Sequence, residues 1–293
     1  MKSFEIGQAI REFRRRYGIT QGDLAAGICD QGLISRIEKG NVIPSSYLLV
    51  QFADRMGISV EDIINHSKFD NVEYVNEVIH QVDLMLKEKN YIELNDFCKL
   101  EQNNPLFNDD QGNRYFLWLE ATCLYYIEGD AKGSIQMLTH ALQSKETSKK
   151  SNSKLDFSIK NSLCVIYGET EQYDLAYNGY KSLIEDLRIN VNVDFKSKIK
   201  IHYNFTKILL HLELYNECLT YCDAAVKMIR AQDSMFLLGN FYYQSGYTHW
   251  KLSHIEEAIQ AIDKAEVIFT IEGKQNVIET ITKRKKEILS ANK

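Results

Sequence analysis

The sequence is poor in the features that break helices or build strands. Only two of its 293 residues are proline, Pro44 and Pro105, and no segment alternates apolar and polar residues as a half-buried strand does. No apolar run reaches about 18 residues, which argues against a membrane span. The first ten residues already begin an amphipathic helix and show no secretory signal. These absences predict an all-α protein of the cytoplasm.

Motifs for catalysis are also missing. The sequence has no P-loop, no metal-binding spacing and no cluster of His, Cys and Asp, so an enzyme has little support. Six cysteines occur without a C-x-x-C motif. We interpret them as small buried side chains in a reducing compartment, with a redox sensor as the alternative. We therefore expect no catalytic residue, no metal and no cofactor.

Charge is distributed unevenly along the chain, whose net charge is −5. Residues 1–60 hold eight Lys and Arg against six Asp and Glu, whereas the remainder holds 27 against 34. A mildly basic head on an acidic body fits a regulator better than a protein that coats DNA nonspecifically.

The segment from Thr20 to Gly40 has the pattern of two short helices joined by a tight turn. Thr20 and Asp30 can each cap a helix, and Gly40 can end the second one in a left-handed conformation. Two short helices joined so closely must cross steeply, as they do in a helix-turn-helix. The second helix of that motif enters the major groove of DNA.

Twelve residues within 5–65 also stand at the spacing of a known domain. Because of them the segment resembles the lambda/434 Cro-repressor (XRE-type) helix-turn-helix: Gly18, Thr20, Gln21, Leu24, Ala25, Ile34, Ser35, Ile37, Glu38, Gly40, Pro44 and Ser45. The resemblance implies a five-helix, lambda-repressor-like DNA-binding domain, which we place at residues 1–66. It also implies a structural ion pair between Arg14 in the first helix and Glu38 in the third.

Polar residues of this motif are candidates for DNA contacts. Gln21 begins the second helix, where an amide can reach a phosphate oxygen. Gln31 can contact adenine with both amide atoms, and Arg36 can contact guanine. Gly32 and Leu33 stand where polar residues are common in such helices, so few side chains of this helix can hydrogen-bond to bases. The full predicted set is Gln21, Gln31, Gly32, Ser35, Arg36, Asn41 and Ser45.

After a polar break at residues 66–71 the chain becomes repetitive. Equivalent turns recur at Tyr91, Ala131, Tyr173, Tyr215 and Ile255, with spacings of 40, 42, 42 and 40 residues. Each turn lies between two amphipathic helices, and a last helix follows. The pattern resembles tetratricopeptide repeats. Over residues 67–293 it predicts an α-solenoid of about five helical hairpins and a capping helix, whose concave groove suits an extended peptide or a partner helix.

Amides recur at matching depth in the first helices of successive hairpins. Asn161, Asn204 and Gln244 lie 12, 11 and 11 residues before their turns, and Asn240 lies one helical turn before Gln244. A carboxamide can pair with both the N–H and the C=O of an extended peptide. A column of amides would therefore hold peptide backbone without reading its sequence. The alternative is that these amides cap loops or face solvent.

Nearly the whole chain resembles the quorum-sensing regulators of Gram-positive bacteria, the Rap/Rgg/NprR/PlcR/PrgX family, and most nearly its PlcR-like members. The likeness rests on the run ICDQGLISRIEKG, the Lys87-x-Lys89 pair, and the segments IKNSLCVIY, HYNFTK and MFLLGNFYYQSG. It implies a homodimeric transcription factor that binds a palindromic operator in double-stranded DNA. The repeat domain of such a protein dimerises and binds a short signalling peptide, held here by Asn161, Asn204 and Asn240.

Lys87 and Lys89 end the first long helix, where they could neutralise a peptide carboxylate or form a solvated face. Two other functions stay open for the same domain. It could sense a small metabolite or a redox state, or its groove could hold a segment of a partner protein.

Overall fold

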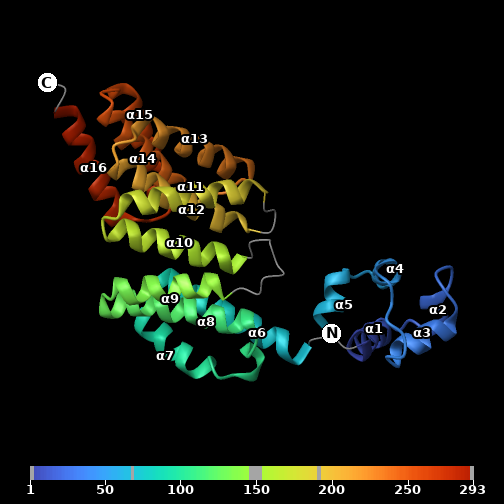
Figure 1. Cartoon of the computed structure of the whole chain (residues 1–293). Coiled ribbons are helices and arrows are strands. Elements are labelled where there is room, and N and C mark those ends of the chain that lie inside the picture. Colours follow the sequence, from blue (N-terminus) through green and yellow to red (C-terminus); the bar gives the residue numbers. More distant parts are fainter. Residues whose placement is uncertain (1–2, 67–68, 145–153, 190–192, 291–293) are drawn as a thin grey trace. The chain divides into compact units, whose positions relative to one another are not determined.

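The computed structural model describes residues 3–66, 69–144, 154–189 and 193–290, and every regular element in these ranges is helical (Figure 1). The all-α prediction is therefore confirmed. By contacts the chain divides into two compact units, Met1–Asn90 and Tyr91–Lys293, called here unit one and unit two. No helix among the described residues combines the length and apolar character needed to cross a bilayer.

Unit one contains the five predicted helices of the head and one longer helix. They are α1 (Ser3–Arg16), α2 (Gln21–Ala25), α3 (Gln31–Glu38), α4 (Ser46–Met56), α5 (Val60–His66) and α6 (Phe69–Glu88). Apolar residues at helical spacing turn one side of each short helix inward. The resulting core includes the fully buried side chains of Ile10, Leu24, Ile34, Ile37 and Phe52.

Helix α1 lies directly against the end of α3. Gly7 makes this approach possible, because a Cβ at that position would come within 1.9 Å of the carbonyl oxygen of Ile37. Any side chain at residue 7 would therefore push the two helices apart.

Unit two consists of helical hairpins. Its elements are α7 (Tyr91–Glu101), the 3-10 turn η1 (Pro105–Phe107), α8 (Asp110–Cys123), the π-helical turn η2 (Leu124–Glu128), α9 (Ala131–Gln143), α10 (Lys154–Glu169), α11 (Tyr173–Ile189), α12 (Phe195–His211), α13 (Tyr215–Ala231), α14 (Leu238–Lys251), α15 (Ile255–Ile271) and α16 (Gln275–Ser290). The second helices of the hairpins begin at the five residues predicted as turns, so the repeat assignment is confirmed.

The turns of the hairpins share one backbone feature. A residue with positive φ stands two positions before each second helix: Lys89, Gly129, Glu171, Glu213 and Ser253. A left-handed residue ends the first helix and reverses the chain. The period of 40 to 42 residues thus reflects a repeated turn geometry, although only one of the five residues is glycine.

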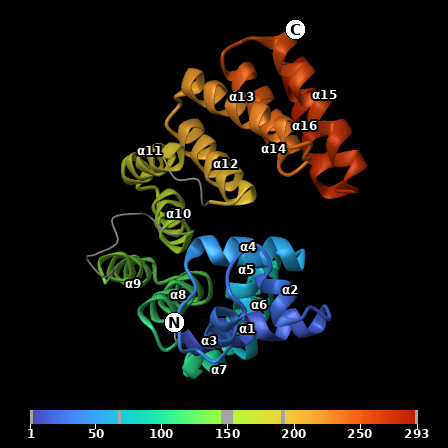
Figure 2. The ribbon, with the colours of Figure 1, turned by 90° about the vertical axis from the view of Figure 1, so that its right-hand side faces the viewer.

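The helices of unit two form two rows. The first helices α8, α10, α12 and α14 make an inner row on the concave side of the curve, and α9, α11, α13 and α15 lie outside them (Figure 2). Helix α12 contacts α10 on one side and α14 on the other. Large side chains fill the space between the rows, among them Phe157, Tyr180, Phe205 and Phe241.

The division by contacts does not coincide with the predicted boundary between residues 66 and 67. Helix α6 contacts α5 and is grouped with unit one, which therefore also contains Lys87 and Lys89. The assignment of residues 1–66 to DNA binding and of 67–293 to peptide binding and dimerisation stays a prediction.

Candidate functional site

Side chains at both helix starts fix the helix-turn-helix. The Thr20 hydroxyl accepts from the Asp23 backbone N–H at 3.1 Å, and Asp23 Oδ2 accepts from the Thr20 N–H at 3.1 Å, which completes a capping box. The Thr20 hydroxyl also donates to Asp23 Oδ2 at 2.6 Å, and this bond, followed by that from the Thr20 N–H, lowers the pKa of Asp23. Asp30 caps α3 by accepting from the Leu33 N–H at 2.9 Å, as predicted. The cap at Asp30 therefore fixes the start of α3 at Gln31.

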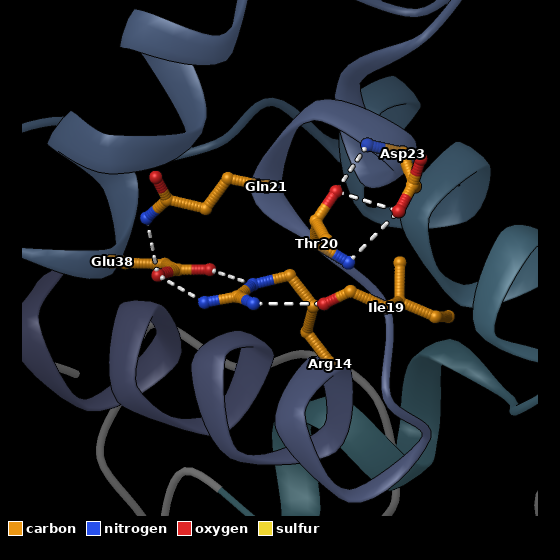
Figure 3. A network of polar contacts seen from close by, with 6 residues as sticks. All are labelled: Arg14, Ile19, Thr20, Gln21, Asp23 and Glu38. Atoms are coloured by element: carbon orange, nitrogen blue, oxygen red, sulfur yellow. Dashed lines mark hydrogen bonds and ion pairs between the residues drawn. The ribbon is translucent and has the colours of Figure 1, made fainter.

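A buried charge network connects α1, α2 and α3 (Figure 3). Arg14 Nε donates to Glu38 Oε1 at 2.6 Å and Nη2 donates to Oε2 at 3.0 Å, while Nη1 donates to the Ile19 carbonyl at 2.8 Å. Gln21 Nε2 donates to the same Glu38 carboxylate at 2.8 Å. The structure thus contains the ion pair that the resemblance implied, and both of its side chains are buried. One carboxylate near the end of α3 holds all three helices.

The position of Gln21 differs from the simple expectation of a phosphate contact. Its amide nitrogen is already hydrogen-bonded to Glu38, so only its second N–H is free to reach a phosphate. The expectation missed this bond because Gln21 and Glu38 are 17 residues apart, and only the crossing of α2 and α3 brings them together.

The remaining predicted DNA contacts lie at the surface of unit one. On α3, Gln31, Gly32 and Arg36 are exposed and Ser35 is half-buried, and they share the side opposite the buried Ile34 and Ile37. We call these four residues the recognition face. Beyond it, Asn41 is exposed, and the exposed Ser45 caps α4 by accepting from the Leu48 N–H at 3.3 Å.

Arg55 was not among the predicted residues, yet its side chain on α4 stabilises the end of α2 in the helix-turn-helix. From α4 its guanidinium donates to the Asp23 carbonyl at 2.8 Å and also to the Ala26 carbonyl, so it satisfies the C-terminal end of α2. No local motif announces this contact, because it joins residues about thirty positions apart.

In unit two, polar side chains link each helix of the inner row to the next. Trp118 Nε1 on α8 donates to Ser162 Oγ on α10 at 2.8 Å. Asn204 Nδ2 on α12 donates to Asn161 Oδ1 on α10 at 3.2 Å. A third such link joins α12 to α14. None of the three follows from the spacing of residues in the sequence, because each joins residues about forty positions apart.

The Asn161–Asn204 pair is half-buried and keeps unused hydrogen-bonding capacity. One bond between two carboxamides leaves both N–H groups of Asn161 and the oxygen of Asn204 available. The structure therefore brings together two of the predicted peptide-binding amides, on neighbouring helices of the inner row. Asn240, on α14, is also half-buried.

Gln244 does not continue the expected column of available amides. Its side chain is only 5% exposed, and its oxygen accepts a hydrogen bond from the Thr206 hydroxyl on α12. This contact is the third link of the inner row. Because the packing of α14 against α12 buries Gln244 and engages its oxygen, this residue has a structural role, and its predicted contact with a peptide stays a prediction.

Burial argues against reactive cysteines. Five of the six are buried, and burial raises the pKa of Cys98 to about 12, that of Cys123 to about 11 and that of Cys164 to about 12. Thiols with such values carry almost no thiolate at neutral pH and react slowly with oxidants. Cys218 has a lowered pKa through a hydrogen bond with Cys222, but both side chains are fully buried.

Two family matches cover most of the chain. Residues 79–290 match the RNPP family C-terminal domain, and residues 10–63 match a helix-turn-helix domain. Comparison with curated protein sequences gives no significant match.

Several solved structures share the fold over almost their full length. PlcR from Bacillus thuringiensis, in complex with the peptide PapR7 and DNA, has a TM-score of 0.81 at 24% identity, with 95% of this chain and 99% of that chain covered. Rgg2, the SHP pheromone receptor of Streptococcus dysgalactiae, has a TM-score of 0.60 at 15% identity, covering 96% and 99%. ComR from S. thermophilus, in complex with DNA and its signalling peptide ComS, gives 0.59 at 14%, covering 97% and 99%.

Proposed function

Because the chain belongs to the RNPP family, we propose that it is a transcription regulator that binds specific double-stranded DNA through unit one and responds to a short signalling peptide bound by unit two. One observation carries the proposal: a helix-turn-helix match at residues 10–63 and an RNPP C-terminal match at residues 79–290 occur on one chain. PlcR and ComR, which share this fold, were solved with both DNA and a peptide. The protein acts as a cytoplasmic regulator and not as an enzyme.

DNA is read by the recognition face of α3. Gln31 and Arg36 supply the two side chains with defined base preferences, and Ser35 lies between them. Asn41, Ser45 and the second amide hydrogen of Gln21 contact phosphates and set the register. The protein acts as a homodimer on a palindromic operator, because two such heads must read half-sites about 34 Å apart.

The peptide lies along the inner row, where Asn161, Asn204 and Asn240 pair with its backbone. The amide pair supports this assignment because its free donors and acceptor match those of an extended chain. Lys87 and Lys89 are further proposed contacts, to a peptide carboxylate, but the proposal does not depend on them.

Peptide binding changes the link between α10 and α12. When the side chains of Asn161 and Asn204 bind the peptide, hydrogen bonds to the peptide replace the bond between them. The packing of α10 against α12 then changes, and this change is passed to the neighbouring helices of the inner row. The shift favours dimers whose heads have the spacing that DNA requires. To reverse the population, the peptide must prefer the active state by several kcal/mol.

The test is calorimetric titration of the full chain with short C-terminal peptides encoded by small open reading frames beside its gene. We expect micromolar or tighter binding of one peptide, lost in Asn204→Ala and kept in Asn178→Ala, whose exposed amide lies on the outer helix α11. Equal binding by Asn204→Ala would remove the amides from the site. If no peptide binds while specific DNA binding is intact, peptide control is wrong and a metabolite or partner protein takes its place.

The DNA half of the proposal has its own test, selection of sites from random double-stranded DNA. We expect a palindrome. Arg36→Ala should lose one base preference in each half-site, at about 1–3 kcal/mol. If the selected sites lack two-fold symmetry, the proposed homodimeric recognition is wrong.

A further inference from the structure

Helix α12 is a positively charged helix in an acidic chain. It carries Lys196, Lys198, Lys200 and Lys207 and contains no Asp or Glu, whereas the whole protein has a net charge of −5. Its position at the centre of the inner row places this charge beside the amide pair.

Two of these lysines share one side of α12 with Asn204. Lys200 lies four residues before Asn204 and Lys207 three residues after it, so each stands about one helical turn away. Both are exposed. The opposite side of the helix is buried, since Phe205 packs against the rings of Tyr180 and Tyr221 in the outer row.

Several lysines of unit two are paired with a carboxylate of the same chain. Lys160 pairs with Asp186 at 2.7 Å, Lys181 pairs with Glu217, and Lys285 pairs with Asp263 at 2.6 Å. Within the described part of the chain, neither Lys200 nor Lys207 has such a carboxylate partner.

The acid that lies just before α12 is already engaged. Asp194 accepts from the Ser197 N–H at 3.0 Å and lies 3.5 Å from Lys154. Asp194 therefore does not neutralise the exposed side of α12. On that side, Lys200 and Lys207 flank Asn204, whose amide is suited to bind a peptide backbone.

We infer that Lys200 and Lys207 make the inner row selective for acidic peptides, by pairing with Asp, Glu or the terminal carboxylate of the peptide that Asn161 and Asn204 hold. This inference rests on the proposed peptide-binding function and specifies its ligand. A nucleic acid is the other common polyanion, but the inner amides match a peptide backbone and the recognition face of α3 provides a separate place for DNA.

The experiment is affinity selection by the full-length protein from an equimolar library of random heptapeptides, with retained peptides sequenced by mass spectrometry. We expect Asp and Glu to be enriched over the input. The double variant Lys200→Gln/Lys207→Gln should retain peptides without this enrichment. The matched control is Lys227→Gln, an exposed lysine on the outer helix α13, which should select like the parent.

The strongest selected peptide then gives a quantitative check. Replacing each of its acidic residues by the amide should weaken binding to the parent about two- to fivefold, which is the range for an exposed ion pair. The loss should shrink as salt is raised, and it should be absent in the double variant.

Each outcome of the selection decides a different point. If peptides are retained without acidic enrichment, or the enrichment persists in the double variant, the lysine assignment is wrong while peptide control stands. If the double variant selects normally but loses DNA affinity, the lysines serve nucleic acid instead. If the parent retains no peptide, the proposed function fails together with this inference.

Discussion

The polar contacts that hold α3 in unit one differ in kind from those that hold α12 in unit two. In unit one a buried carboxylate, Glu38, receives hydrogen bonds from Arg14 and Gln21 and holds three helices together. In the inner row of unit two, α8 and α10 are also joined by a buried ion pair, between Arg114 and Asp156. The links from α12 to its neighbours are instead neutral, and the Asn161–Asn204 link is half-buried. A buried charge pair is expensive to break, whereas a neutral bond near solvent exchanges easily for a ligand. Helix α3 of unit one is therefore held in a fixed position, whereas the contact between α10 and α12 in unit two is the one that binding can alter.

The turns follow the same division. Within α1 to α5, every described residue with positive φ is glycine: Gly18, Gly27, Gly40 and Gly57. The hairpin turns of unit two instead use Glu171, Glu213 and Ser253 as well as Gly129. A side chain in the left-handed region costs about 1–2 kcal/mol. The turns between α1 and α5 thus have no backbone strain of this kind, whereas the hairpin turns of unit two do.

The strongest test of this comparison is Glu38→Ala. It leaves the Arg14 guanidinium buried without its counter-ion, and we expect about 3–5 kcal/mol of destabilisation. Both tryptophans, Trp118 and Trp250, lie in unit two. Hydrogen exchange should therefore accelerate in α1 and α3, while the unfolding transition followed by tryptophan fluorescence stays where it was.

The control for this variant is Glu61→Ala, which removes an exposed carboxylate in α5 and should change stability by less than about 0.5 kcal/mol. A loss below about 1 kcal/mol in Glu38→Ala would mean that the network does not hold the helix-turn-helix.

The second prediction concerns the approach of α1 to α3. Gly7→Ala adds a methyl group 1.9 Å from the Ile37 carbonyl oxygen, so the helices must separate. We expect about 1–3 kcal/mol of destabilisation in thermal unfolding of unit one. In Gly22→Ala the nearest atom lies at 3.7 Å, and this variant should instead gain up to about 1 kcal/mol from helix propensity. Equal effects in the two variants would contradict the close approach.

Much of this architecture follows from local sequence patterns. The caps at Thr20 and Asp30 and the turns before Tyr173 and Tyr215 were predicted because capping and amphipathic spacing are properties of neighbouring residues. The roles that the sequence did not reveal all depend on how helices cross. Whether Gln244 faces ligand or Thr206 is decided by the distance between α12 and α14, which residue spacing does not contain.

The third prediction separates stability from ligand binding in the inner row. Asn161→Ala removes a neutral, half-buried hydrogen bond, so we expect only about 0.5–1.5 kcal/mol of destabilisation in urea unfolding followed by tryptophan fluorescence. Under the proposed function the same variant should bind peptide at least tenfold more weakly. Thr206→Val serves as the comparison, since it breaks the buried link to Gln244 and should lower stability more while leaving the amide pair in place.

The contradicting result for the third prediction is a large loss of stability in Asn161→Ala, comparable with that of Glu38→Ala. The inner row would then be as rigidly fixed as the head. Exchange of the Asn161–Asn204 bond for a peptide could not serve as a low-energy switch.

The smallest expected effect tests the strain in the turns. In Glu171→Gly the left-handed conformation costs nothing, which recovers about 1–2 kcal/mol, but the unfolded chain gains freedom worth about 0.4–1 kcal/mol. The net expectation is a gain of about 0.5–1 kcal/mol for unit two, measured by urea unfolding. Glu185→Gly, an exposed site within α11, should instead lose about 1 kcal/mol, because there glycine only adds flexibility to a right-handed helix. If both variants lose stability equally, the left-handed conformation at residue 171 carries no strain energy. Side chains at these turn positions would then be tolerated without cost, and peptide binding could not gain free energy by relaxing the turns.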